Sequence, residues 1–147
     1  MKRCILLLFI LKGMGAYPTG WRTHFVFDKQ SGKRITLDSL VLPSKRKAFQ
    51  ALLQSMQKDS MEMYRQELKV WLENNEVDSS DYEYALEQTK NNCWEYYDAT
   101  NFVLHKDRLE VVINCEFMHA LRNLTPYSSL YIPLKDIQPY LKPTYRK

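Results

Sequence analysis

The residues best suited to nucleophilic or metal chemistry in this 147-residue chain are its three cysteines and three histidines. Among the histidines, His24, His105 and His119, only the last lies close to a cysteine, in the spacing Cys115-x-x-x-His119. One such pair lacks the four ligands of a structural zinc site. A small hydrolase or thiol enzyme using Cys93 or Cys115 with His119 is an alternative hypothesis, although no local signature surrounds either cysteine.

Carboxylates are plentiful, but their arrangement does not indicate catalysis. General acid–base work needs two groups whose surroundings separate their pKa values, whereas the acidic residues here fall on helix faces that we expect to be exposed. The four glycines, at positions 13, 15, 20 and 32, form no phosphate-binding fingerprint. We therefore expect a non-enzymatic protein with no catalytic residues, no cofactor and no metal site.

Charge is segregated along the sequence. Residues 1–47 contain ten Lys or Arg against two acidic residues, and residues 59–98 contain eleven acidic against three basic residues. This acidic block disfavours nucleic acid as a partner and favours a basic one. Solvated helix faces are the alternative explanation. The residues expected to contact a partner are Glu73, Glu76, Asp78, Asp81, Glu83 and Glu87.

The bulk composition indicates one globular α+β domain over residues 1–147. Hydrophobic residues make up 45% of the chain and charged residues 26%, with a net charge of +4. These values exclude a disordered or collagen-like chain, and the length suits a single core. We expect antiparallel hairpins packed against two to three helices.

Two segments have the alternating pattern of a β-hairpin. Residues 21–27 alternate with period two, a turn at 28–33 contains Gly32, and residues 35–37 resume extended structure. Residues 102–104 and 109–113 form the second hairpin around a polar turn. Residues 130–134 are expected to form a last strand.

Helices are expected between these hairpins. A first helix starts near Pro43 with Lys45, Arg46 and Lys47 at its beginning, where the helix dipole disfavours cations, so this basic triplet is either an anion contact or solvated surface. The pair Asp59 and Glu62 can open a second helix, or the first can continue as one long bent helix. Another capping pair, Ser80 and Glu83, precedes a third helix, and residues 135–141 form a short helical segment.

The first fifteen residues have two interpretations. A positive start, an apolar run at residues 4–11 and small residues after it resemble a short signal peptide, but Lys12 interrupts the pattern. The same run also fits a first core strand, and it is too short to span a membrane. Cys93 and Cys115 are either a disulfide pair in an oxidising compartment or two buried thiols.

Several short motifs occur in an order that resembles the RsiV-type extracytoplasmic domain. They are Gly15-Ala16-Tyr17-Pro18, Phe27-Asp28, Ser31-Gly32-Lys33, Leu37-Asp38-Ser39-Leu40, Asn101-Phe102-Val103-Leu104, Pro126-Tyr127 and Ile132-Pro133-Leu134. The resemblance covers residues 13–141. Met14 and Tyr17 stand where that family has a glycine and a histidine, so no role that needs an imidazole is carried over.

The resemblance implies a bacterial extracytoplasmic module, in the periplasm or on the cell surface. Such domains are found in lysozyme-sensing anti-sigma factors and beside the catalytic domain of peptidoglycan deacetylases. The implied function is recognition of a protein or cell-wall ligand, with lysozyme as the sharpest candidate, because lysozymes are basic and the acidic block is complementary to them. A toxin immunity or inhibitor protein is a further alternative.

Overall fold

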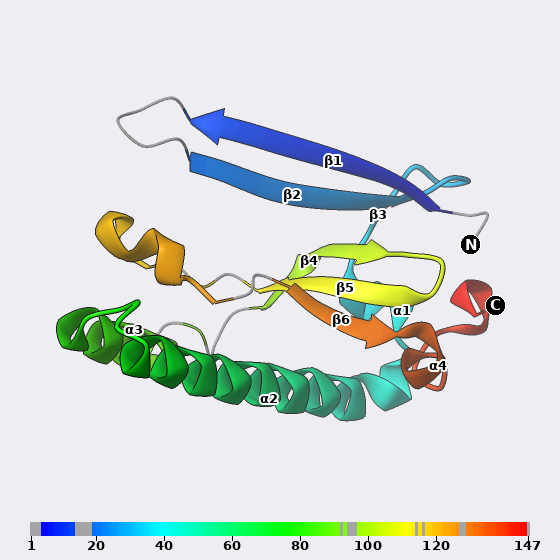
Figure 1. The fold of residues 1–147 in the computed structure, drawn as a ribbon. Helices are drawn as coiled ribbons and strands as arrows, with labels where there is room; N and C mark the ends of the chain where they lie inside the picture. The colour runs from blue at the N-terminus through cyan, green and yellow to red at the C-terminus, as the bar shows by residue number, and fades with distance from the viewer. Residues whose placement is uncertain are drawn as a thin grey trace. The chain divides into compact units, whose positions relative to one another are not determined.

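The computed structural model describes residues 4–13, 19–91, 93, 97–113, 115, 117–126 and 129–146. Within these ranges the fold is α+β, with helices and two three-stranded antiparallel sheets, which confirms the predicted fold class (Figure 1). The chain forms two compact units. Unit 1 comprises Met1–Phe49, Asp98–Val111 and Tyr131–Lys147, and unit 2 comprises Gln50–Tyr97 and Val112–Leu130. The prediction of one domain over residues 1–147 stays a prediction.

The first sheet contains β1 (Cys4–Gly13), β2 (Thr19–Asp28) and β3 (Arg34–Ile35), in that order. Figure 1 shows β1 and β2 as a long hairpin, and their antiparallel pairing runs from Cys4 opposite Asp28 to Gly13 opposite Thr19. The strand interpretation of the N-terminus therefore describes residues 4–13. Residues 1–3, 14 and 15 of that segment lie outside the described ranges.

Within β2 the period-two pattern is present, and its more buried side consists of His24 and Val26 rather than the aromatic residues. Their exposed fractions are 8% and 2%, whereas Phe25 and Phe27 are only half-buried. The turn that follows closes with Gly32 at a φ of 66°, a conformation that glycine adopts without strain.

The segment after β3 is helical earlier than the sequence pattern predicts. Thr36 caps α1 (Leu37–Leu40): its Oγ1 accepts a hydrogen bond from the Ser39 amide, and its own amide donates to Ser39 Oγ at 3.0 Å. This reciprocal capping box satisfies backbone donors that an extended strand would leave for a neighbouring strand. The prediction of extended structure through Leu37 is wrong for that residue.

The helical region is built from two main helices. The 3-10 turn η1 (Pro43–Lys45) leads into α2 (Arg46–Glu73), a single helix of 28 residues, so of the two predicted alternatives the continuous helix is observed. A loop containing Asn75, at a φ of 57°, connects it to α3 (Ser79–Asn91).

The second sheet contains β4 (Tyr97–Leu104), β5 (Arg108–Ile113) and β6 (Ser129–Pro133), in that order. This confirms the second predicted hairpin and the last strand, except at Leu134, which was predicted as strand and instead begins a helix. The 3-10 helix η2 (His119–Leu124) lies between β5 and β6 in the sequence. After β6 come α4 (Leu134–Ile137) and the 3-10 turn η3 (Pro143–Tyr145). An isolated bridge between Val41 and Leu141 connects the C-terminal segment to the end of α1.

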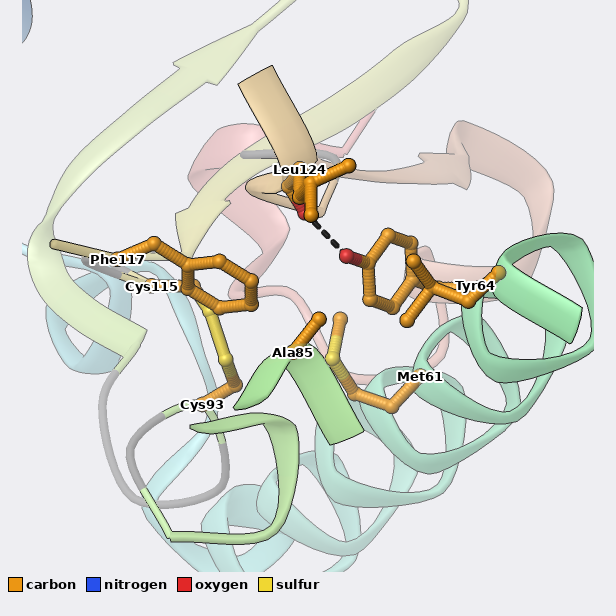
Figure 2. Close-up of a cluster of buried hydrophobic side chains, with 8 residues drawn as sticks. Met61, Tyr64, Ala85, Cys93, Cys115, Phe117 and Leu124 are labelled. Carbon is orange, nitrogen blue, oxygen red and sulfur yellow. Dashed lines mark hydrogen bonds between the residues drawn. A yellow bond between two sulfur atoms is a disulfide. The ribbon is translucent and has the colours of Figure 1, made fainter. Parts of the chain in front are cut away.

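Unit 2 has its own apolar core, shown in Figure 2. Side chains of α2 and α3 cluster there with the disulfide and with residues that follow β5: Met61, Tyr64, Leu68, Ala85, Cys93, Cys115, Phe117 and Leu124. The Tyr64 hydroxyl donates a hydrogen bond to the Leu124 carbonyl. Because this hydroxyl is buried, the bond removes the desolvation cost that an unpaired polar group would have.

Among the helices that the structure describes, none has both the length and the apolar character of a membrane span.

Candidate functional site

The six acidic residues predicted to contact a partner all belong to unit 2, and we call them the acidic surface. Glu73 ends α2, Glu76 and Asp78 lie in the connecting loop, and the others are on α3. Asp81 is half-buried and the other five are exposed. The structure thus places the predicted residues in one helix–loop–helix segment: Glu73, Glu76, Asp78, Asp81, Glu83 and Glu87.

Three of the six carboxylates have partners within the chain. Glu73 pairs with Lys69 one turn earlier on α2 at 3.9 Å, and Glu76 accepts a hydrogen bond from the Asn74 amide group at 3.2 Å. Exposed pairs of this kind contribute little to stability, so both carboxylates keep most of their ability to attract a cationic ligand.

Asp78 has a structural role as the N-cap of α3. Its Oδ1 accepts hydrogen bonds from the Asp81 amide at 2.9 Å and from the Ser80 hydroxyl at 2.8 Å. The backbone hydrogen bond from Asp81, followed by that from Ser80, lowers the pKa of the Asp78 carboxyl. The capping residue is therefore Asp78, and the prediction that Ser80 and Glu83 form the capping pair is wrong because the helix starts earlier.

The other three, Asp81, Glu83 and Glu87, form no ion pair or hydrogen bond through their side chains with any described residue. Glu83 and Glu87 are four residues apart, so they share one side of α3, roughly opposite the buried Ala85. Two like charges at this spacing repel each other, and a cationic ligand would relieve that repulsion.

Two exposed apolar side chains lie on α2, the helix that ends at Glu73. Met63 is 71% exposed and Val70 is 50% exposed. With Asp59 four residues before Met63 and Glu73 three residues after Val70, the helical spacing puts these residues on one side of α2. Apolar side chains flanked by charge are the usual composition of a protein-binding surface.

Charge differs sharply between the two units. Unit 2 contains eleven acidic and five basic residues, and unit 1 contains six acidic and sixteen basic residues, giving net charges of −6 and +10. The segregation seen along the sequence is therefore also a segregation between folded units.

The two candidate nucleophiles are joined to each other. Cys93 and Cys115 form a disulfide across 22 residues of sequence, and they are 0% and 8% exposed. In this state neither sulfur is a thiol, so the thiol-enzyme hypothesis has no nucleophile at either position. Its proposed base, His119, begins η2, and the side chain of His119 lies outside what the structure describes.

His24 is accounted for as a buried structural histidine. Its ring Nδ1 lies 3.0 Å from Asn101 Oδ1, and its backbone amide donates to the same oxygen at 3.0 Å. Since both side chains are buried, this pairing satisfies polar groups inside unit 1.

A polar cluster on unit 1 was not anticipated from the sequence. His105 Nε2 lies 2.8 Å from Glu110 Oε2, and the Tyr131 hydroxyl donates to Glu110 Oε1 at 3.4 Å. The Arg108 guanidinium lies over the Tyr131 ring at 5.2 Å. The only local signal was the polar turn that brings His105 and Glu110 together, because Tyr131 comes from a distant strand. Among the described residues, no three metal-ligating side chains are grouped closely enough to hold an ion.

No family model matches the chain, and no curated protein matches it. A solved structure of a DUF3298 family protein from Pseudomonas aeruginosa PAO1 is similar, with a TM-score of 0.49 and 19% sequence identity. The alignment covers 97% of this chain and 56% of that one, so this chain spans little more than half the length of that protein. DUF3298 is a family of uncharacterised domains.

Proposed function

We propose that the chain is a non-enzymatic binding module of the bacterial cell envelope that recognises a basic protein, with lysozyme as the sharpest candidate. The observation that carries this proposal is the acidic surface, where exposed carboxylates of α2, α3 and their loop lie within a unit of net charge −6. Complementary charge steers association and excludes partners of the same sign.

The apolar residues on α2 support a protein as the ligand. A carboxylate surface alone would attract any cation. Val70, one turn before Glu73 on α2, and Met63, two turns further back, add exposed apolar area on the same side of that helix. Apolar contacts supply affinity when water is removed from them, while the surrounding charges give orientation and specificity. A folded basic protein fits this combination better than a small cation.

The disulfide supports the envelope location. Cytosolic proteins of most organisms keep their cysteines reduced, whereas the periplasm and cell surface allow disulfides to persist. The buried pair Cys93 and Cys115 therefore agrees with the extracytoplasmic location that the RsiV-type resemblance implies.

Calorimetric titration of lysozyme into the full chain, at about 20 mM and about 150 mM salt, tests the proposal. We expect binding that weakens as salt increases. The triple variant Glu76→Gln, Glu83→Gln and Glu87→Gln should weaken binding about tenfold, since each exposed charge contributes a few tenths of a kcal/mol or more. Asp78 is left intact in this variant because it caps α3.

A matched control removes three negative charges from unit 1 through Asp38→Asn, Asp107→Asn and Asp136→Asn. We expect its affinity for lysozyme to stay within about twofold of the wild type. Equal weakening by both variants would contradict a site on α2 and α3, and no binding at either salt would eliminate lysozyme. If the bound lysozyme lost its wall-hydrolysing activity at equimolar chain, the inhibitor alternative would be favoured.

A further inference from the structure

A groove of about 430 Å³ on unit 1 is lined mainly by polar and cationic side chains. Its walls come from the turn after β2, from β3, from α1 and from the C-terminal segment around η3. The cations come from different parts of the chain: Lys33 ends the turn, Arg34 begins β3, and Lys142 lies just before η3. Segments far apart in the sequence thus bring three positive charges to one recess.

Backbone contacts hold the two sides of this groove together. The Lys142 amide donates to the Leu40 carbonyl at 2.9 Å, and the Leu42 amide donates to the Tyr140 carbonyl at 2.8 Å. On the other side, the Asp28 amide donates to the Lys33 carbonyl at 2.9 Å and closes the turn. Backbone hydrogen bonds therefore fix the segments that carry these cations.

The side chains themselves are suited to an anion. In the part of the chain that the structure describes, neither Lys33 nor Lys142 is paired with a carboxylate. The Arg34 guanidinium lies 4.4 Å from the centre of the Phe25 ring, which orients its planar group. An arginine held in this way loses less conformational freedom when it binds an anion.

The one acidic residue in the groove is already used by the turn. Asp28 Oδ1 accepts hydrogen bonds from the Gln30 amide at 3.0 Å, the Ser31 amide at 2.9 Å and the Ser31 hydroxyl at 3.1 Å. These hydrogen bonds stabilise the carboxylate but leave its negative charge. Because three cations line the groove against this one carboxylate, the field in the groove is positive, and the net charge of +10 on unit 1 strengthens it.

We infer that this groove binds a phosphate-bearing anion. A phosphate group carries more charge than a carboxylate and offers more acceptor oxygens, so it can engage two lysines and an arginine together. The groove is also larger than inorganic phosphate alone needs, which leaves room for a second phosphate or an attached polyol. This site lies in a different unit from the acidic surface and does not depend on the proposed function.

The direct test is calorimetric titration of pyrophosphate into the full chain at low salt and neutral pH. The wild type should bind pyrophosphate. The variant Lys33→Gln, Arg34→Gln and Lys142→Gln should bind about tenfold more weakly, because each lost contact is a charge-assisted hydrogen bond. The double variant Lys33→Gln and Lys142→Gln should also weaken binding. It keeps the contact between Arg34 and Phe25, so it tests the groove even if the triple variant fails to fold without that contact.

A matched control removes the same three charges from the basic triplet through Lys45→Gln, Arg46→Gln and Lys47→Gln. These residues are exposed in unit 1 but do not line the groove. We expect the control to bind pyrophosphate within about twofold of the wild type. Circular dichroism should show the same fold for every variant.

Two ligand comparisons complete the test. Citrate, a tricarboxylate, should bind more weakly than pyrophosphate. A glycerol-phosphate oligomer is titrated in the same way. Tighter binding of the oligomer than of pyrophosphate indicates a polymeric ligand, and tighter binding of pyrophosphate indicates a small phosphate compound. The inference is overturned if the wild type does not bind pyrophosphate, if citrate binds equally well, or if the control weakens binding as much as the groove variant.

Discussion

At the scale of single residues, Tyr64 gives the clearest prediction about stability. Its side chain is 2% exposed and its hydroxyl donates to the Leu124 carbonyl. Tyr64→Phe keeps the ring but leaves that buried carbonyl without its partner, so we expect a loss of about 1–2 kcal/mol in the free energy of unfolding. Urea denaturation measures it. The control Tyr131→Phe, at a residue that is 54% exposed, should change stability by less than about 0.5 kcal/mol.

Tyr64 also predicts how the free energy of unfolding changes at alkaline pH. Burial, and then the charge of Glu67, raise the pKa of Tyr64 well above its ordinary value of 10.0. A folded-state pKa above the unfolded one contributes stability that is complete below pH 10 and decreases as the pH rises beyond it. We expect Tyr64→Phe to lose less stability than the wild type between neutral pH and about pH 11. Identical pH profiles for both proteins would contradict this assignment.

Residue partners were the least predictable feature, because they depend on contacts between distant positions. The sequence predicted the turn that contains His105. It did not predict the contact between the His105 ring and Glu110, because a sequence pattern does not fix side-chain direction after a turn. His24 finds Asn101 77 residues later. The side of β2 that is buried was not predictable either, because both alternating sets of residues contain apolar side chains.

At the scale of elements, the cap of α3 is expected to control the stability of the acidic surface. Asp78→Ala removes the acceptor for the Asp81 amide, and we expect the melting temperature to fall by a few degrees. Asp78→Ser retains a capping oxygen and should recover most of the loss. Circular dichroism melting curves measure both, with Asp59→Ala, an exposed position within α2, as the control.

The dependence of stability on acid pH distinguishes the Asp78 carboxylate from a neutral capping residue such as serine. The hydrogen bonds from Asp81 and Ser80 keep the folded-state pKa of Asp78 below its ordinary value of 3.8. Its contribution is therefore present above that value and lost as the pH falls through the folded-state pKa. We expect Asp78→Ser to lose less stability than the wild type when the pH is lowered from about 5 to about 3.

Local patterns predicted most elements well and their boundaries less well. The alternation in residues 21–27 and 109–113 predicted β2 and β5, and the apolar stripe predicted α2. The boundary errors at α1 and α3 arose from caps: Thr36 and Asp78 start their helices earlier than the apolar pattern indicates. A hydrogen bond to a cap is a local contact, but several residues nearby could have provided it.

At the scale of the whole molecule, charge segregation was readable from the sequence because acidic and basic residues are grouped along the chain. The sequence did not show which folded unit each charged stretch belongs to, because unit 1 combines three separate stretches of sequence. The basic groove shows the same limit: Lys33 and Lys142 are more than a hundred positions apart in the sequence, and only the fold places them in one recess.

The disulfide supports the last prediction, which concerns the stability of the entire chain. Cys93 and Cys115 are 22 residues apart, and closing a loop of this length restricts the unfolded chain by about 3 kcal/mol. We expect the variant Cys93→Ala and Cys115→Ala to lose about 2–4 kcal/mol in the free energy of unfolding, measured with urea. Reductant should destabilise the wild type by a similar amount and leave the double variant unchanged. A wild type that unfolds at the same urea concentration with and without reductant would contradict the prediction, and with it the support that this bond gives to an oxidising compartment.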